Sequence, residues 1–335
     1  MGGRSPNTVR MRFCILSCIQ LNAKLGFQSQ FGKEELRLLV PAPDRAAHRM
    51  TPASVDRSGP PAVEPLPLSE GGMVFRRVSS LAEYHECVVI QEETWGDNFR
   101  ERVPSAILMG GQKLSGVCAA AFGPTGRMLG FVFGLTGPYR GELVHWSDLL
   151  AVRSEARGAH VGERLKRYQR ELCRAVGVER IYWTFDPLVA RNAHLNLRRL
   201  GARASEYVVN MYGSNTGSPL HGTLETDRWV AAWDVSPSNG EVVAPDPKPD
   251  GVFVVSATPD GLTPLSESLP SVPVVRVAIP SDFERLSPPQ RAAWREATRE
   301  AFLHYLALGY QVTTFQRAMR DQPPFFELAA SPARG

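Results

Sequence analysis

Leu149-Leu150-Ala151-Val152-Arg153-Ser154-Glu155-Ala156-Arg157-Gly158-Ala159-His160-Val161-Gly162 joins an apolar run to a short turn that contains glycine. Its apolar first part predicts the end of a buried strand, and a short glycine-containing turn then leads into a long amphipathic helix over 157–176. The first N–H groups of a helix lack partners within the helix and lie at the positive end of its dipole, so they can bind pyrophosphate. Small residues let the backbone approach such a ligand. The same turn is equally typical of a strand-to-helix connection without a ligand.

Hydrophobic periodicity outside this stretch predicts further strands and helices. Expected helices cover 81–94, 187–200 and 288–308, besides 157–176. Expected strands cover 74–78, 117–122, 128–135, 145–152, 180–185, 207–212, 229–235, 252–256, 274–279 and 310–315. An early hairpin followed by strand–helix units predicts an α/β fold with a mixed sheet.

Composition divides the chain into four parts. Residues 1–72 are expected to form a disordered extension, or to follow from a misassigned start, because 41–72 are rich in Pro, Ala, Ser and Gly and Met73 opens the first strand. A folded domain is expected over 73–235 and a linker-like segment over 236–272. Residues 273–325 are expected to form a C-terminal extension that packs on the core.

Charge and cysteine content exclude several classes of function. Of the formal net charge of +4, +3 lies in residues 1–72, so the rest of the chain is close to neutral. It lacks the dense basic face that a nucleic-acid binder usually needs, and nucleic acid is not expected as a partner. The five cysteines form no zinc-binding pattern, and no metal is expected. No apolar stretch approaches twenty residues, and the run at 13–21 is a weak export signal, so a cytoplasmic protein without a membrane span is expected.

The quoted turn resembles the acyl-CoA signature of the GNAT (GCN5-related N-acetyltransferase) superfamily, Arg/Gln-x-x-Gly-x-Gly/Ala. Arg157 matches its first position and Gly162 its last, while His160 stands where the middle glycine belongs. The resemblance implies that acetyl-CoA or another acyl-CoA is bound here. Its expected ligands are the strand end, for the pantetheine arm, and the turn, for the pyrophosphate: Leu150, Ala151, Val152, Arg157, Gly158, Ala159, His160, Val161 and Gly162.

A second segment, residues 183–202, resembles the closing part of the GNAT core. Ala193 and Gly201 match the family alanine and glycine, and Asn192 is a candidate ligand of CoA or a solvent-facing residue. The catalytic tyrosine of many members falls at Leu197, so this chain lacks it there. The wording Trp-Thr-Phe-Asp-Pro-Leu at 183–188 resembles a bacterial subgroup of predicted GNAT acyltransferases with a C-terminal extension, in which some members are thought to be N-succinyltransferases. The implied fold is a mixed, mostly antiparallel central sheet flanked by helices, with a C-terminal α+β extension.

Acyl transfer to an amine needs a base, and the strand before the turn offers Asp148 and His145 as catalytic candidates. Strand alternation places them on opposite faces, so only one can face the substrate unless a bulge intervenes. Asp148 lies where serotonin acetyltransferases of the family hold a catalytic histidine. The alternative is a structural ion pair of Asp148 with Arg191 or Arg153.

Three further polar residues have candidate roles. Arg191 and Arg228 could bind the carboxylate of an amino-acid acceptor, and Asp186 is expected to cap a helix. The resulting hypothesis is an acyl-CoA-dependent N-acyltransferase that moves an acetyl or succinyl group to a small-molecule amine, with an amino acid as the favoured acceptor. The alternative is a non-catalytic module of GNAT type that binds CoA or a metabolite. A homodimer is left open.

Overall fold

The computed structural model describes residues 67–219, 222, 224–235, 245–266, 268–320 and 322–330. The expectations for residues 1–66 and for 236–244 lie outside this described part of the chain. No helix within it is both long and apolar enough to span a bilayer.

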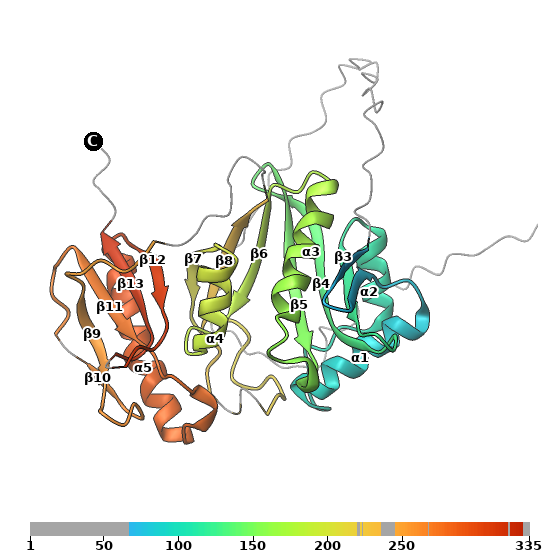
Figure 1. The fold of residues 1–335 in the computed structure, drawn as a ribbon. Coiled ribbons are helices and arrows are strands. Elements are labelled where there is room, and N and C mark those ends of the chain that lie inside the picture. The colour runs from blue at the N-terminus through green and yellow to red at the C-terminus, as the bar shows by residue number, and fades with distance from the viewer. Residues whose placement is uncertain are drawn as a thin grey trace, which may run out of the picture. The chain divides into compact units, whose positions relative to one another are not determined.

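The first sheet has eight strands in the order β1-β2-β3-β4-β5-β6-β8-β7 (Figure 1). Their bounds are β1 Leu68–Glu70, β2 Met73–Arg77, β3 Val117–Phe122, β4 Met128–Tyr139, β5 Glu142–Val152, β6 Arg180–Phe185, β7 Arg203–Val208 and β8 Arg228–Asp234. All neighbouring strands are antiparallel except β5 and β6, which are parallel. The expected mixed, mostly antiparallel sheet is confirmed, and it includes β1 from the segment expected to be disordered.

Helices cover both faces of this sheet, and β3 shows how the sequence directs them. Cys118, Ala120 and Phe122 pack with α1 (Leu81–Trp95) and α2 (Ser105–Lys113). Ala119 and Ala121 join the cluster that contains the apolar side of α3 (Val161–Ala175). Successive side chains of a strand point to opposite faces, so a run of small apolar residues lets helices pack closely on both sides.

The helices differ from expectation at their ends. The helix expected from residue 157 begins at Val161, because His160 adopts a left-handed conformation with φ of 56° that interrupts it. The helix expected over 187–200 is α4 (Ala190–Ala193), which continues as the π-helix η2 (His194–Arg199). Helix α2 was not expected, since Gly110 and Gly111 lower its intrinsic helix propensity.

A second sheet follows, with strand order β10-β9-β11-β13-β12 and helix α5 (Pro288–Ala307). Its strands are β9 Val252–Ala257, β10 Pro264–Ser266, β11 Val274–Ala278, β12 Tyr310–Gln316 and β13 Phe325–Ala330. The stretch expected to be linker-like, 236–272, therefore contains two strands, and β13 was not expected. Phe302 of α5 lies 5.1 Å from Trp229 of β8 between ring centroids, so the two sheets share one apolar core.

Candidate active site

The ladder between strands β5 and β6 covers only part of their length. Their ladder consists of Val144–Arg180, His145–Ile181 and Trp146–Tyr182. Beyond it, β5 stays paired with β4 as far as Val152, whereas β6 stays paired with β8 as far as Phe185. Among the described residues no ladder joins the two strands past Trp146. The backbone edges of residues 147–152 and 183–185 therefore border a gap, which we call the β5–β6 gap. An extended ligand with amide groups could pair with these edges.

A β-bulge lies at the start of this gap. Phe133 of β4 pairs with Leu149 and Gly134 pairs with Ser147, so Asp148 is the extra residue of β5. A bulge re-aims the side chain at that point and often occurs next to an active site. Gly134 is required opposite the bulge, because a Cβ there would overlap with the His145 imidazole and the Trp146 carbonyl oxygen.

Asp148 combines access to solvent with a raised pKa. The residue is exposed at the bulge, yet surrounding atoms remove part of its hydration. This burial raises the pKa of the carboxyl, a hydrogen bond from Trp146 opposes the shift, and the nearby charge of Glu101 adds to it. Asp148 does not form the ion pair with Arg153 or Arg191 that was its alternative role. Arg153 pairs with Glu86 and Glu93, and Arg191 pairs with Glu284. A carboxylate with a raised pKa and open access can act as a base.

His145 lies on the opposite face and is completely buried. Its Nδ1 is 2.9 Å from Thr136 Oγ1 and its Nε2 is 2.9 Å from the Gln169 side-chain nitrogen. Burial lowers the pKa of His145 to about 3, with Lys166 and Arg77 contributing. A buried imidazole engaged through both nitrogens cannot reach a substrate at Asp148, so the structure argues against His145 as a base.

A tyrosine that sequence reasoning missed lies near Asp148. Tyr212 follows β7, and its hydroxyl is 3.0 Å from Thr184 Oγ1, on the part of β6 beyond its ladder with β5. Burial raises the pKa of Tyr212, and the negative charges of Asp148 and Glu101 add to the shift, so the three groups lie within electrostatic range of one another. The backbone N–H of Tyr212 donates to Thr226 Oγ1 at 2.9 Å. Leu197, at the position of the family tyrosine, is buried in the core. No spacing in the sequence could have revealed that a loop supplies the phenol.

The loops beside Tyr212 and Glu101 are tied together. The Arg100 backbone N–H donates to Thr216 O at 2.9 Å, and Gly217 lies against the Asn98 backbone so closely that any Cβ would overlap with it. Gly217 also has a φ of 73°, which favours glycine. The connection between α1 and α2 and the connection between β7 and β8 thus form one border of the site.

The turn before α3 has free donors. Ser154–Ala156 forms a short 3-10 helix, Gly158 has a φ of 86°, and residues 157–160 are exposed. No described residue accepts from the backbone N–H of Gly158 or of residues 160–163. These donors at a helix start fit an anionic group such as a phosphate. His160 adopts a left-handed conformation, which glycine takes at lower cost than other residues. Its imidazole lies 3.6 Å from the Glu163 carboxylate.

The remaining predicted ligands line the same region. Leu150, Ala151 and Val152 form the end of β5, with Leu150 and Val152 packed on the α3 side and Ala151 on the other. A Cβ on Gly162 would lie 3.7 Å from both Leu150 and Val152, an ordinary contact, so the fold itself does not require glycine. Asn192 is half-buried on α4, next to the end of β6, and Arg157 is exposed.

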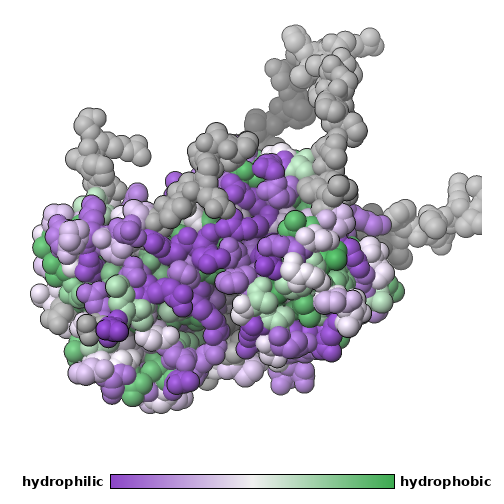
Figure 2. All heavy atoms as spheres, viewed as in Figure 1, coloured by the Kyte–Doolittle hydropathy of each residue, from purple (hydrophilic) through white to green (hydrophobic). Residues whose placement is uncertain are grey.

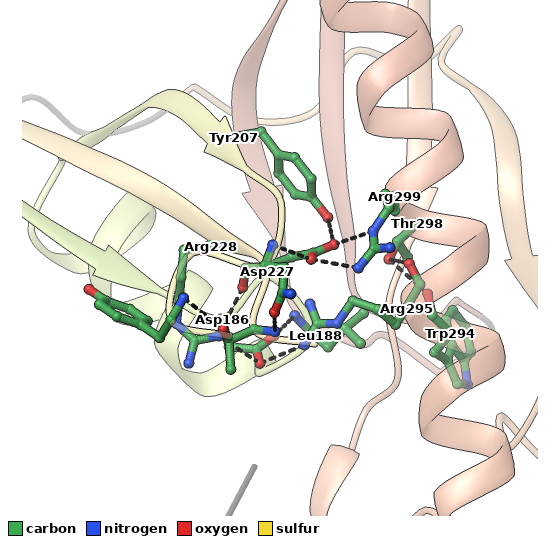
Figure 3. A network of polar contacts seen from close by, with 12 residues as sticks. Asp186, Leu188, Tyr207, Asp227, Arg228, Trp294, Arg295, Thr298 and Arg299 are labelled. Atoms are coloured by element: carbon green, nitrogen blue, oxygen red, sulfur yellow. Dashed lines mark hydrogen bonds and ion pairs between the residues drawn. The ribbon is translucent and has the colours of Figure 1, made fainter. Parts of the chain in front are cut away.

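Arg228, expected to bind a substrate carboxylate, is buried and engaged by protein groups. It lies 3.3 Å from Asp186 Oδ2 and donates to the Asp227 carbonyl oxygen, with its guanidinium 5.5 Å from the Tyr212 ring centroid. The same Asp186 oxygen accepts from Arg295 of α5 at 2.7 Å (Figure 3). Asp186 also accepts from the Leu188 N–H, but α4 begins only at Ala190, so it is not the expected helix cap. Burial alone would raise the pKa of Asp186, and the two arginines lower it.

Two other features do not join this site. A cavity lies between η2, β7 and β12, lined in part by Leu197, Ala204 and Val312, and none of its lining residues belongs to the groups around Asp148. Within the described residues, no three His, Cys, Asp or Glu side chains are grouped in a way that could hold a metal ion.

Comparison with known proteins gives likeness to solved structures alone. No protein-family model matches the chain, and no curated protein matches it. It is similar to the ribosomal-protein-S18-alanine N-acetyltransferase of Escherichia coli, at 14% identity over 50% of this chain and 97% of that one, with a TM-score of 0.39. It is similar to the ribosomal-protein-S5-alanine acetyltransferase of Vibrio fischeri, at 12% identity over 52% and 100%, with a TM-score of 0.40. It is also similar to a chain of the NatC complex bound to Gag peptide and CoA, at 13% identity over 49% of this chain and 99% of that one, with a TM-score of 0.39.

Proposed function

We propose that this chain is an acyl-CoA-dependent N-acyltransferase of the GNAT type. The observation that carries the proposal is the β5–β6 gap, with the Asp148 bulge at one end and the free N–H groups before α3 on the same strand–turn–helix unit. A gap bordered by two unpaired backbone edges fits a long arm with amide groups, and a helix start fits its phosphates.

The binding roles follow from this geometry. The N–H groups of Gly158 and residues 160–163 would hold the pyrophosphate, with Arg157 close by on the exposed turn. The backbone edge of residues 150–152 would hold the pantetheine arm. Acyl-CoA supplies an activated thioester when bound. Asn192, beside the end of β6, is a further candidate contact.

The catalytic roles fall to Asp148 and Tyr212. Asp148 takes a proton from the ammonium group of the acceptor, which frees the nitrogen lone pair to attack the acyl carbon. Tyr212 donates its hydroxyl proton to the sulfur as the carbon–sulfur bond breaks, since its raised pKa keeps it protonated at neutral pH. The nitrogen then gives its second proton to the phenolate oxygen of Tyr212, which restores the phenol.

The acceptor we propose is a small-molecule primary amine, with amino acids as the first class to test. Arg228 is buried against Asp186, whereas Arg191 forms an exposed pair with Glu284, so Arg191 is the more accessible of the two candidates for a substrate carboxylate. The acyl group is acetyl or succinyl.

The experiment combines binding and turnover. Calorimetry with CoA is expected to give saturable binding, and acetyl-CoA or succinyl-CoA with a panel of amines is expected to release free thiol and a mass-shifted amine. Saturable CoA binding without thiol release across the panel would favour the non-catalytic binding module. Absence of CoA binding would contradict the proposal.

A further inference from the structure

Lys166 is a fully buried cation without a hydrogen-bond acceptor. It lies on α3 at 2% exposure, and no described residue accepts from its Nζ. The Nζ lies 3.7 Å from the centroid of the Trp183 ring. The other basic residues of α3 reach the surface, where Figure 2 shows hydrophilic residues gathered over the middle of the face that carries α3 and η2. Burial of an unpaired ammonium destabilises a fold, so this inward lysine calls for a role.

The groups around Lys166 offer no compensating negative charge. Thr136 Oγ1 donates its only hydrogen to Ser115 O at 2.8 Å, so it accepts from Nδ1–H of His145. The His145 Nε2 then accepts from the Gln169 amide at 2.9 Å, which makes the imidazole neutral. Cys173 is a thiol at neutral pH, since burial raises its pKa to about 12. The Gln169 Oε1 also has no partner in the described chain.

The position of Lys166 relates it to the β5–β6 gap. Trp183 is the first residue of β6 beyond the last ladder pair, Trp146–Tyr182, and its side chain faces α3. Lys166 follows Val161, the first residue of α3, by five positions, which is about 7–8 Å along a helix axis. A ligand with phosphates at the start of α3 and an arm in the gap would therefore run past the ammonium group.

We propose that Lys166 donates a hydrogen bond to an amide carbonyl oxygen of the pantetheine arm of acyl-CoA in the β5–β6 gap. The Trp183 ring holds the ammonium group beside the gap, and the ligand supplies the acceptor that the protein lacks. This inference rests on the proposed function.

The test compares CoA with 3′-phosphoadenosine 5′-phosphate, which keeps the 3′-phosphate and the first of the two 5′-phosphates of CoA and lacks the pantetheine arm. Lys166→Met is expected to weaken CoA binding about tenfold, the loss of one charged hydrogen bond. It is expected to leave binding of 3′-phosphoadenosine 5′-phosphate unchanged and to raise the melting temperature without ligand, because a buried charge has been removed. Lys113→Met, on the surface of α2, is the matched control and should change none of the three.

Unchanged CoA affinity in Lys166→Met, or equal loss for both ligands, would overturn the inference. If the variant does not fold, ¹⁵N NMR of the lysine side chains in the wild-type chain decides. The inference expects the Lys166 signal to shift with CoA and not with 3′-phosphoadenosine 5′-phosphate, and an unshifted signal overturns it. If wild-type protein binds 3′-phosphoadenosine 5′-phosphate but CoA no more tightly, only the role of Lys166 fails. If it binds neither, the proposed function fails as well.

Discussion

Asp148 owes its orientation to one extra residue in β5, and its chemistry to that orientation. In a regular strand Asp148 would have a partner on β4, but the bulge leaves it without one and exposed between buried Ser147 and Leu149. Because burial raises its pKa, Asp148 becomes ionised at a higher pH than an ordinary aspartate does. Asp148→Asn keeps the size and removes the basicity. We expect kcat to fall about a hundredfold with little change in the KM for the acyl donor, because the phosphate contacts lie elsewhere.

Steady-state rates across pH 6–9, about the range in which an amine acceptor titrates, check this expectation. The acidic limb of the wild-type profile should be absent in Asp148→Asn. Glu101→Gln is the matched control: it removes a charge that raises the pKa of Asp148, so the limb should move to lower pH without a comparable loss of kcat. A folded Asp148→Asn enzyme with the wild-type rate over this range would remove Asp148 from the mechanism.

The proposed role of Tyr212 as an acid gives a second prediction. As the proton donor to the departing sulfur, its phenol must stay protonated, and the raised pKa ensures this at neutral pH. Tyr212→Phe should lower kcat at least about tenfold across the profile, while CoA affinity by calorimetry stays unchanged. Thr184→Val, which removes only the hydroxyl that contacts Tyr212, should have a smaller effect. Equal rates in Tyr212→Phe and wild type would leave solvent as the acid.

Lys166 and His145 predict how stability depends on pH. The pKa of Lys166 is lowered to about 7, chiefly by burial, so above pH 7 the unfolded chain binds more protons than the folded one. The free energy of unfolding should therefore rise with pH from about 7 to 8.5, by at most about 1.4 kcal/mol per pH unit. The pKa of His145 is lowered to about 3, so the free energy of unfolding should show a separate rise between pH 3 and the ordinary pKa of 6.5. Urea unfolding of Lys166→Met should lose the upper rise and keep the lower one. A persistent upper rise would assign it to another group.

At the scale of elements, the sequence predicted the parts whose pattern is local. The β3–β4 hairpin, the run from β5 to α3 and the strand β6 all follow from apolar periodicity and glycine, and the structure confirms them. The bulge could not be predicted, because it depends on how β4 and β5 register across the sheet. Gly134 was its one local trace. The role of Tyr212 was not predicted, because the residue lies in a loop. Helix α2 and strand β13 were not predicted, because their periodicity is weak over so few residues.

The turn before α3 gives the prediction at this scale. Gly162 lies where a side chain would meet only Leu150 and Val152 at an ordinary distance, so substitution should not disturb the fold. Gly162→Glu places a carboxylate beside N–H groups that would hold phosphates, and like charges repel. We expect CoA affinity to fall more than tenfold by calorimetry with an unchanged melting temperature. Gly162→Ala is the control, and it should retain near-wild-type binding. Equal CoA affinity in Gly162→Glu would place the phosphates elsewhere.

At the scale of the whole molecule, α5 reaches the active site through buried charges. Arg295 and Arg228 meet at Asp186, and Arg228 lies beside Tyr212. The second sheet and its helix thus support the position of a proposed catalytic residue. The sequence predicted that the C-terminal residues pack on the core, but it could not reveal the two pairs at Asp186, because their members lie 42 and 109 positions apart.

The ion pair between Asp227 and Arg299 tests how far the contact of α5 with the first sheet stabilises the protein. Asp227 is completely buried and accepts from Arg299 at 2.7 and 2.8 Å, from the Tyr207 hydroxyl at 2.7 Å and from the Asn210 N–H at 3.0 Å (Figure 3). Asp227→Asn removes the charge and leaves these donors poorly paired, so the free energy of unfolding should fall by about 3 kcal/mol.

The control for this pair is another ion pair between distant segments. Asp246 pairs with Arg198, but its side chain is 89% exposed, so Asp246→Asn should cost less than about 1 kcal/mol. Urea unfolding followed by tryptophan fluorescence measures both variants. Because Trp229 and Phe302 belong to one core, Asp227→Asn should keep a single transition at a lower midpoint. If instead the transition splits in two while the midpoint of the first sheet is unchanged, the two sheets unfold separately and α5 does not hold the active site in place.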